Sequence, residues 1–409
     1  LIVVIFLAFE FGEGAHTYDI AVTAHHRYGL EQMLGLVTVH DDSPFGLELP
    51  GTLVDVEHDD VHTQIKGSLL GAQTGTQTVI EEYQQAVLEE GDEILAESVT
   101  LTPQPQMSFT VENQHTGQIV AMIGGRGAKE VSRGFNRATD AARQPGSCFK
   151  VLAAFAPAID SCGMTLATVY NDAPFNYYNG TPVSNWYGEE YKGLCNLRYG
   201  VYWSLNVVAV KTITQISPQL GYNYLQNFGI YTLVDSKLIG DMIYSDIGQP
   251  LALGGITDGV LNYELNAAYA SIANGGVYIE PKMYTTVVDP EGNIILDATQ
   301  PTVRQTVSPQ TAYLLTSAMK DCVTIGTGTN ARFPGMSIAG KTGTTSSSVN
   351  VWFAGYTPYY TATTWAGYDN NVHMNGSGET NTAKNIWFAN THMIVAKHIF
   401  CKINNTWHK

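Results

Sequence analysis

The chain has 409 residues and a formal net charge of −16 at neutral pH. A chain of this length predicts two domains, and its acidic balance argues against nucleic-acid binding, which needs a basic face. No run of apolar residues approaches the roughly 18 that a membrane-spanning helix requires, and the apolar segment Leu1–Phe9 is half that length. We interpret this segment as the cut end of a larger protein, with a buried strand or an interfacial segment as alternatives.

The negative charge is concentrated in the first quarter of the chain. Residues 1–105 carry 18 acidic and two basic residues, whereas residues 106–409 carry 19 of each. This change in charge predicts a domain boundary near Pro103–Pro105. We therefore expect a small acidic module over 1–105, a larger domain over 106–390 and an unassigned tail over 391–409.

The first quarter is predicted to be rich in β-structure. Alternating apolar and polar residues predict a hairpin over 51–66, with its tip at 57–60. Helical spacing follows over 78–90, and a strand is predicted over 94–99. These elements indicate a small β-rich module, for which an OB-like barrel is one candidate fold.

From residue 107 onward the pattern predicts strands at both ends of a group of helices. The predicted strands span 108–111, 118–123, 350–356 and 360–368. The predicted helices span 148–156, cut or kinked at Pro157, and 207–213. A long polar loop is expected over 170–200, where it could line a cleft. Strands before and after the helices predict one antiparallel sheet with helices packed on it, which is an α+β domain.

Three short motifs follow one another in this part of the chain. They are Ser147-Cys148-Phe149-Lys150 (S-x-x-K), Ser204-Leu205-Asn206 (S-x-N) and Lys341-Thr342-Gly343 (K-T-G). A serine hydroxyl needs a base within hydrogen-bond reach to act as a nucleophile. A lysine three residues later on the same helix meets that need, provided that burial lowers its pKa. The second serine can relay protons, and the set is typical of penicillin-binding proteins and class A β-lactamases.

Each motif alone is weak, because the chain contains a second copy of two of them. Ser317–Lys320 is another S-x-x-K, and Ser348–Asn350 is another S-x-N. Ser147 is favoured as the nucleophile because Pro145-Gly146 can start a helix there and because the other motifs follow it in order. Ser317 is interpreted as part of an exposed helix face.

A nucleotide-binding alternative overlaps the third motif. Residues 335–342 fit G-x-x-x-x-G-K-[ST], the phosphate-binding P-loop. A P-loop must follow a buried strand and open directly into a helix. Residues 342–348 are poor helix formers, and Pro334 makes a preceding strand doubtful, so a strand followed by a polar turn is the favoured interpretation.

Further segments occur in the order found in one protein family. They are Thr116-Gly117, Ala121–Gly125, Phe135–Thr139, Arg143–Ser147, Asp172–Pro174, Leu251–Gly255, Ala273–Gly276, Thr327–Thr329 and Trp352–Pro358. With the three motifs, they make residues 107–388 resemble the transpeptidase domain of bifunctional (class A) penicillin-binding proteins. The resemblance implies a five-stranded antiparallel sheet with helices on both faces, as in penicillin-binding proteins and serine β-lactamases. Residues 1–105 resemble, more faintly, the small β-module that some of these proteins place before this domain.

The resemblance also implies a reaction. Ser147 would attack the carbonyl carbon between two D-alanines of a peptidoglycan stem peptide, and an amine of a second stem peptide would then capture the acyl-enzyme. Lys150 would take the hydroxyl proton, and Ser204 would pass it to the leaving amine with Lys341 nearby. Asn206 would hold the stem-peptide amide and help to fix Lys150.

Substrate binding is assigned in the same way. The substrate carboxylate would be received by Lys341, Thr342 and Thr344, with Gly343 completing the substrate-binding strand. Backbone N–H groups of Ser147 and Thr344 would form the oxyanion hole. The implied activity is a serine-type D-Ala-D-Ala transpeptidase that β-lactam antibiotics inhibit covalently.

The expected partners are peptidoglycan stem peptides and β-lactams, not nucleic acid. No cofactor is expected, and no metal, because the five cysteines are scattered without a C-x-x-C pair. The resemblance places the protein at the extracytoplasmic face of the bacterial cell membrane, held by an anchor that this chain lacks. Alternatives are a D,D-carboxypeptidase, a β-lactamase and a non-catalytic β-lactam sensor. The deacylating glutamate of class A β-lactamases is not recognisable, since Glu264 has the wrong spacing.

Overall fold

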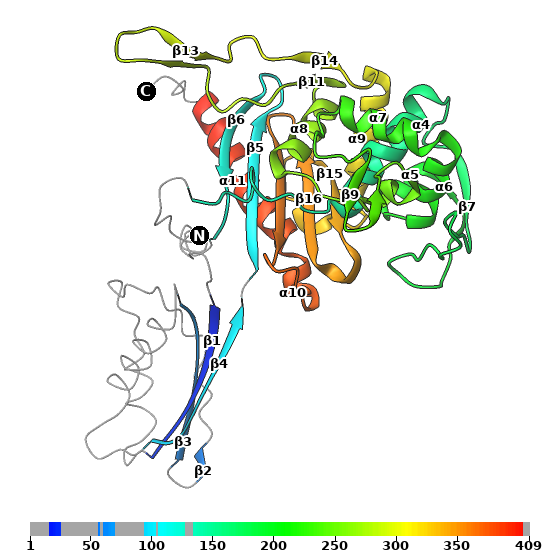
Figure 1. The fold of residues 1–409 in the computed structure, drawn as a ribbon. Coiled ribbons are helices and arrows are strands. Elements are labelled where there is room, and N and C mark those ends of the chain that lie inside the picture. Colours follow the sequence, from blue (N-terminus) through cyan, green and yellow to red (C-terminus); the bar gives the residue numbers. More distant parts are fainter. Residues whose placement is uncertain are drawn as a thin grey trace. The chain divides into compact units, whose positions relative to one another are not determined.

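The structure is a computed structural model that describes residues 16–25, 56–57, 60–69, 94–103, 105–126 and 134–403. The chain divides into two compact units, residues 1–106 with 125–134 and residues 107–124 with 135–409. Each unit has its own sheet (Figure 1).

The described part of the first unit is an antiparallel sheet with strand order β2-β3-β1-β4. The strands are β1 (His16–His25), β2 (Val56–Glu57), β3 (Asp60–Leu69) and β4 (Ile94–Pro103). The pairing of Glu57 with Asp60 confirms the predicted hairpin, and β4 confirms the strand predicted over 94–99. The helix predicted over 78–90 and the segment Leu1–Phe9 lie outside the described residues.

The second unit is built on a five-stranded sheet with strand order β15-β16-β17-β5-β6. The strands are β5 (Gln106–Asn113), β6 (Gln118–Ile123), β15 (Ala339–Thr344), β16 (Asn350–Tyr356) and β17 (Thr361–Gly367). Segments from both ends of the domain therefore share one sheet, because β17 lies beside β5. The predicted α+β class is confirmed.

Helices cover both faces of this sheet, as predicted (Figure 1). Helices α8 (Asn262–Ala273) and α9 (Pro309–Thr324) pack on one face, and α11 (Thr382–Ile403) packs on the other. Every residue of β16 is buried, because alternate side chains enter two different apolar clusters. Trp352 joins the α8–α9 side, whereas Phe353 contacts Trp387 of α11 with ring centroids 5.0 Å apart. Residues 391–403, unassigned from the sequence, complete α11.

A buried helical segment carries the first motif into the core. It consists of η1 (Gly146–Cys148), η2 (Lys150–Phe155) and α4 (Ala156–Ser161). The hydrogen bonding changes from the π-type to the α-type at Ala156, next to Pro157, which has no N–H to donate. The sequence correctly predicted a break near Pro157, but the helical path continues to Ser161.

The remaining elements are short helices and two-stranded antiparallel pairs. The helical elements are α5 (Leu197–Tyr202), α6 (Asn206–Ile216), α7 (Pro218–Asn227), η3 (Gln249–Leu253), η4 (Thr329–Ala331), η5 (Ser346–Ser348) and α10 (Gly376–Thr380). The small antiparallel pairs are β7 (Val169–Asp172) with β8 (Gly193–Asn196), β9 (Lys237–Ile239) with β10 (Met242–Tyr244), β11 (Val277–Ile279) with β14 (Val303–Gln305) and β12 (Thr286–Val288) with β13 (Ile294–Asp297).

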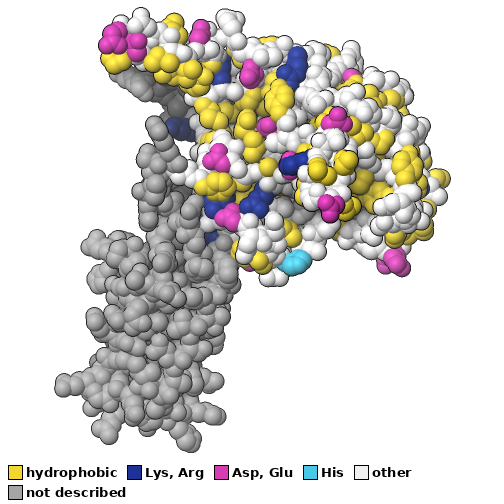
Figure 2. All heavy atoms as spheres, in the orientation of Figure 1, with side chains coloured by type: hydrophobic (Ala, Val, Ile, Leu, Met, Phe, Trp, Pro, Cys, Tyr) yellow, Lys and Arg dark blue, Asp and Glu magenta, His cyan; other side chains and the backbone are white. Residues whose placement is uncertain are grey.

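The β12–β13 pair projects from the domain with apolar side chains in solvent. Figure 2 shows hydrophobic side chains on this projection at the upper left, with acidic side chains at its end. Val288, Ile294 and Ile295 are each more than half exposed. Within the described residues, no helix is long and apolar enough to cross a membrane.

Candidate active site

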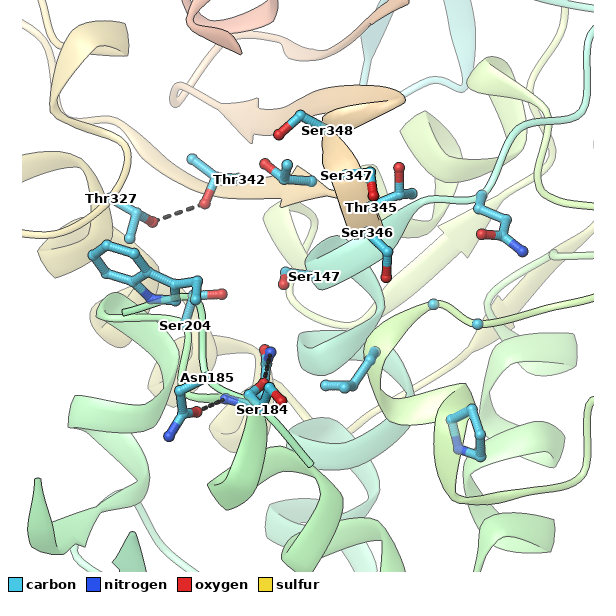
Figure 3. Close-up of a pocket in the computed structure, with 18 of the residues that line it drawn as sticks. Ser147, Ser184, Asn185, Ser204, Thr327, Thr342, Thr345, Ser346, Ser347 and Ser348 are labelled. Carbon is cyan, nitrogen blue, oxygen red and sulfur yellow. Dashed lines mark hydrogen bonds between the residues drawn. The ribbon is translucent and has the colours of Figure 1, made fainter. Parts of the chain in front are cut away.

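The three motifs meet at a cleft of about 900 Å³. Its walls come from the segment before η1, the loop before α5, the start of α6, η3, the edge strand β15 and the first turn of α11. Figure 3 shows Ser147 at the start of its helical segment, with Ser204 on one side and the 345–348 loop on the other. The Ser147 side chain is partly exposed and lines the cleft.

Two glycines bring the Ser147 turn against the edge of β15. Gly146 has a φ of +54°, and a Cβ atom there would lie 2.6 Å from the carbonyl oxygen of Thr344. A Cβ atom on Gly343 would lie 2.4 Å from the carbonyl oxygen of Pro145. Both distances are too short for a side chain, so the glycines of the P-G-S and K-T-G segments permit this contact.

The edge of β15 offers unused backbone groups to the cleft. The N–H of Thr345 donates to the carbonyl oxygen of Asn350 on β16 at 3.1 Å. Because hydrogen-bonded and non-hydrogen-bonded pairs alternate in an antiparallel ladder, the backbone groups of Thr342 and Thr344 point away from β16. They face the side where Gly146 lies, so the N–H of Thr344 is directed toward the Ser147 turn.

The second motif joins the lysine of the first. Lys150 is fully buried, and its Nζ donates to the carbonyl oxygen of Ser204 at 2.6 Å and to Oδ1 of Asn206. The hydroxyl oxygen of Ser204 lies 3.1 Å from the same Nζ. Ser204 has a φ of +58°, which is unfavourable for a serine. The strained backbone therefore places both Ser204 oxygens against Lys150.

The lysine of the third motif reaches the same hydroxyl. Lys341 is fully buried in β15, and its Nζ donates to Ser204 Oγ at 2.9 Å and to the carbonyl oxygen of Thr342 at 3.0 Å. The Ser204 hydroxyl thus lies between two lysines, one from each side of the site. A hydroxyl can donate one proton and accept two, so this position suits a proton relay.

Burial lowers the pKa of both lysines. The pKa of Lys150 lies well below its ordinary value because its ammonium is desolvated and, to a smaller extent, because Lys341 is close. A neutral Lys150 amine has two N–H groups, which can donate to the carbonyl oxygen of Ser204 and to Oδ1 of Asn206. Its lone pair can accept the proton of the Ser204 hydroxyl. A charged Lys341 can donate to Ser204 at the same time. The geometry is therefore compatible with one neutral and one charged lysine.

One predicted contact is not made in this structure, and the side chain predicted to bind a substrate amide already has protein partners. No hydrogen bond joins Ser147 to Lys150 in the described part of the chain, where Lys150 instead contacts Ser204 and Asn206. Both ends of the Asn206 amide have protein partners, since its Nδ2 donates to the carbonyl oxygen of Ser184 at 2.7 Å. To hold a substrate amide, Asn206 would have to exchange one of these partners. Thr344 is exposed at the cleft, and Thr342 bonds to Thr327 (Figure 3).

The second S-x-x-K copy lies outside the cleft and the P-loop alternative has the wrong geometry, whereas Ser348 of the second S-x-N copy lines the cleft. Ser317 is in α9, does not line the cleft, and accepts a hydrogen bond from Arg198 at 2.8 Å. Lys320 is exposed. The P-loop alternative fails because Lys341 lies inside strand β15, and the chain then continues to Thr344 as strand without entering a helix.

Several residues at the cleft were not assigned a role from the sequence. Asn185, in the predicted polar loop, accepts the backbone N–H of Asn206 at 2.9 Å and so fixes the start of α6. Trp186 stacks on Trp203 at 6.2 Å to form an aromatic wall. Lys384 of α11 also lines the cleft. Across the described ranges, no three His, Cys, Asp or Glu side chains converge as a metal site would require.

Comparison with known proteins identifies the family. Residues 107–391 match the family described as penicillin binding protein transpeptidase domain, and the chain belongs to this family. It is 38% identical over 296 residues to penicillin-binding protein 1A of Clostridium acetobutylicum, covering 69% of this chain and 35% of that protein. It is 35% identical over 263 residues to penicillin-binding protein 1F of Bacillus subtilis, covering 63% and 34%.

The fold is also shared with solved structures. The PonA1 protein from Mycobacterium tuberculosis, solved in complex with penicillin V, matches with a TM-score of 0.61 and 22% identity, covering 78% of this chain and 82% of that one. The chain spans about a third of the length of the curated relatives that it matches, 35% and 34% for the two above. The predicted class of protein, a penicillin-binding transpeptidase, is thus confirmed.

Proposed function

We propose that this chain is a peptidoglycan D,D-transpeptidase that works through an acyl-enzyme on Ser147. The observation that carries the proposal is the hydrogen-bonded set of Lys150, Ser204 and Lys341, buried beside Ser147 at the open edge of β15. This set supplies a nucleophile, a base with a lowered pKa and a relay, which are the groups that acyl transfer needs. Membership of the transpeptidase family supports the same reaction.

In the first step, Ser147 Oγ bonds to the carbonyl carbon of the penultimate D-alanine. The Ser147 proton passes to Lys150, directly once substrate has closed the gap or through the Ser204 hydroxyl. The negative charge that develops on the carbonyl oxygen is stabilised by the N–H groups of Ser147 and Thr344, each donor of this kind contributing roughly 3–4 kcal/mol in other enzymes. The oxyanion site follows from the close contact of the Ser147 turn with Thr344.

In the second step, the carbon–nitrogen bond breaks and Ser204 gives its proton to the leaving D-alanine amine. Lys150 returns the proton to Ser204, while Lys341 holds the Ser204 oxygen in position. The amine nitrogen of a second stem peptide then bonds to the ester carbonyl carbon, and the bond between that carbon and Ser147 Oγ breaks. The proton that the amine loses passes to Ser147 Oγ. A β-lactam would acylate Ser147 in the same way, but its leaving amine would stay attached.

The proposal extends to the organisation and location of the protein. Residues 106–390 would form the transpeptidase domain, and residues 1–105 a separate acidic module. Because peptidoglycan is assembled outside the cell membrane, the reaction would take place at its extracytoplasmic face. The PonA1 complex with penicillin V supports β-lactams as ligands.

The activity can be tested with a stem-peptide donor that ends in D-Ala-D-Ala and a second peptide as the acceptor amine. We expect release of D-alanine together with a cross-linked peptide, and loss of both in Ser147→Ala. Release of D-alanine without cross-linked product at high acceptor concentration would instead identify a carboxypeptidase. Acylation by penicillin without either product would identify a β-lactam sensor.

A further inference from the structure

Lys384 is the only charged side chain lining the cleft among the residues that the structure describes. It is partly buried in the first turn of α11 and, within that part of the chain, has no hydrogen-bond or ion-pair partner. A cation near a helix N-terminus opposes the helix dipole. Helix stability therefore gives no reason for a lysine at this position.

The other two lysines of the site are not available to a ligand. Lys150 and Lys341 are fully buried, and neither lines the cleft. The Lys341 ammonium is directed to Ser204 and to the backbone of Thr342. It therefore cannot bind a substrate carboxylate directly without leaving these partners, and the cleft would lack a positive charge if Lys384 were absent.

The register of the sheet places the threonines of the third motif on the side of the sheet where α11, the helix of Lys384, packs. Thr342 pairs with Phe353, and Thr344 pairs with Val351. Directly paired residues point to the same face of a sheet. Phe353 and Val351 belong to the apolar cluster beneath α11. The side chains of Thr342 and Thr344 consequently lie on the α11 face of the sheet edge.

We propose that Lys384 binds the terminal carboxylate of the D-Ala-D-Ala donor, and the carboxylate of a β-lactam, together with the hydroxyls of Thr342 and Thr344. This inference rests on the proposed function. The pKa of Lys384 is lowered, chiefly because its ammonium is desolvated and in part because Lys341 is near. A bound carboxylate would offset both the desolvation of the ammonium and the repulsion from Lys341. The Lys384 ammonium is therefore suited to binding an anion.

The test compares one β-lactam with and without its carboxylate. Acylation rate constants are measured for benzylpenicillin and for its methyl ester, using the wild-type chain and Lys384→Met. We expect the variant to react about 10- to 100-fold more slowly with benzylpenicillin, as loss of a hydrogen bond to a charged group implies, and at an unchanged rate with the ester. Lys384→Arg should restore most of the preference for the free acid.

Lys397→Met is the matched control, because Lys397 is an exposed lysine of the same helix. It should leave both rates unchanged. Equal slowing of both compounds by Lys384→Met, or no change in either, would overturn the assignment of Lys384 while leaving the proposed function intact. A wild-type chain that reacts with neither compound would overturn the proposed function itself. Thermal unfolding of each variant verifies that it is folded.

Discussion

The Lys150 amine nitrogen lies 3.1 Å from the hydroxyl oxygen of Ser204. This contact joins the first motif to the second, which lie more than 50 residues apart in the sequence. The Lys150 side chain is fully buried, so water does not reach its amine. Because Lys341 bonds to the same hydroxyl from β15, the Ser204 hydroxyl is the point at which hydrogen bonds from the first and third motifs meet.

The first prediction concerns the charge of Lys150. If its neutral amine is the base, acylation by a fluorescent penicillin should rise with pH through the lowered pKa of Lys150 and level off well below the ordinary lysine pKa of 10.5. Lys150→Arg keeps the positive charge but cannot lose a proton, so acylation should fall by about 10²- to 10⁴-fold. The control is Lys320→Arg, on the exposed side of α9. A Lys150→Arg variant that reacts at the normal rate would exclude lysine as the base.

The second prediction concerns a buried carboxyl group on the sheet. Glu112 of β5 is 1% exposed and accepts a hydrogen bond from Asn266 at 3.0 Å. Burial raises the pKa of Glu112 to about 8, from an ordinary value of 4.5. The folded protein then holds a proton that the unfolded chain loses, so this contribution to stability is present below pH 4.5 and is lost as the pH rises through about 8.

Glu112→Gln removes this titration and should make unfolding less sensitive to pH. As the pH rises from 5 to 8.5, the wild type should lose stability that the variant keeps. The difference between the two free energies of unfolding should change by an amount on the order of a few kcal/mol in favour of the variant. Chemical denaturation at both pH values measures it, with Glu291→Gln, an exposed position, as the control. Glu264, whose pKa is raised to about 7, contributes a slope of the same sign that remains in both proteins. Parallel pH profiles for wild type and Glu112→Gln would contradict the prediction.

The strands predicted before and after the helices indicated the α+β class, and the family resemblance implied the five-stranded sheet. The order of the motifs selected Ser147, Ser204 and Asn206, which line one cleft in the structure. The π-type start of the Ser147 segment and the left-handed backbone of Ser204 could not be predicted, because tertiary contacts impose them against local propensity. Asn185 and Lys384 belong to segments without a motif. They reach the cleft only because the loop before α5 and the first turn of α11 fold over it.

The path of α11 could not be read from the family resemblance either, because the resemblance ends near residue 388. Its packing rests on contacts with residues that are distant in the sequence. The Trp387 indole donates to the carbonyl oxygen of Ala362 at 2.9 Å, and Val395 is 2% exposed. The spacing of apolar residues can predict that a helix is buried, but it does not indicate which strands the helix packs against.

The third prediction is that the penicilloyl-enzyme is long-lived. Rapid deacylation requires a second base beside the ester, which class A β-lactamases supply as a glutamate. No acidic side chain lines the cleft among the described residues. Glu264 is buried in α8, where it bonds to Thr232 at 3.4 Å, and it does not line the cleft. A chromogenic β-lactam should be consumed in a single stoichiometric burst; continued turnover would make the chain a β-lactamase.

The most direct test is mass spectrometry of the intact chain after it has been mixed with penicillin, followed by peptide mapping of the adduct. The account predicts one penicilloyl group per chain, persisting for many minutes and recovered on the peptide that contains Ser147. Ser147→Ala should remain unmodified, whereas Ser317→Ala should be labelled like the wild type. A label recovered on Ser317, or on any other residue, in the wild-type chain would contradict the assignment of Ser147 as the nucleophile.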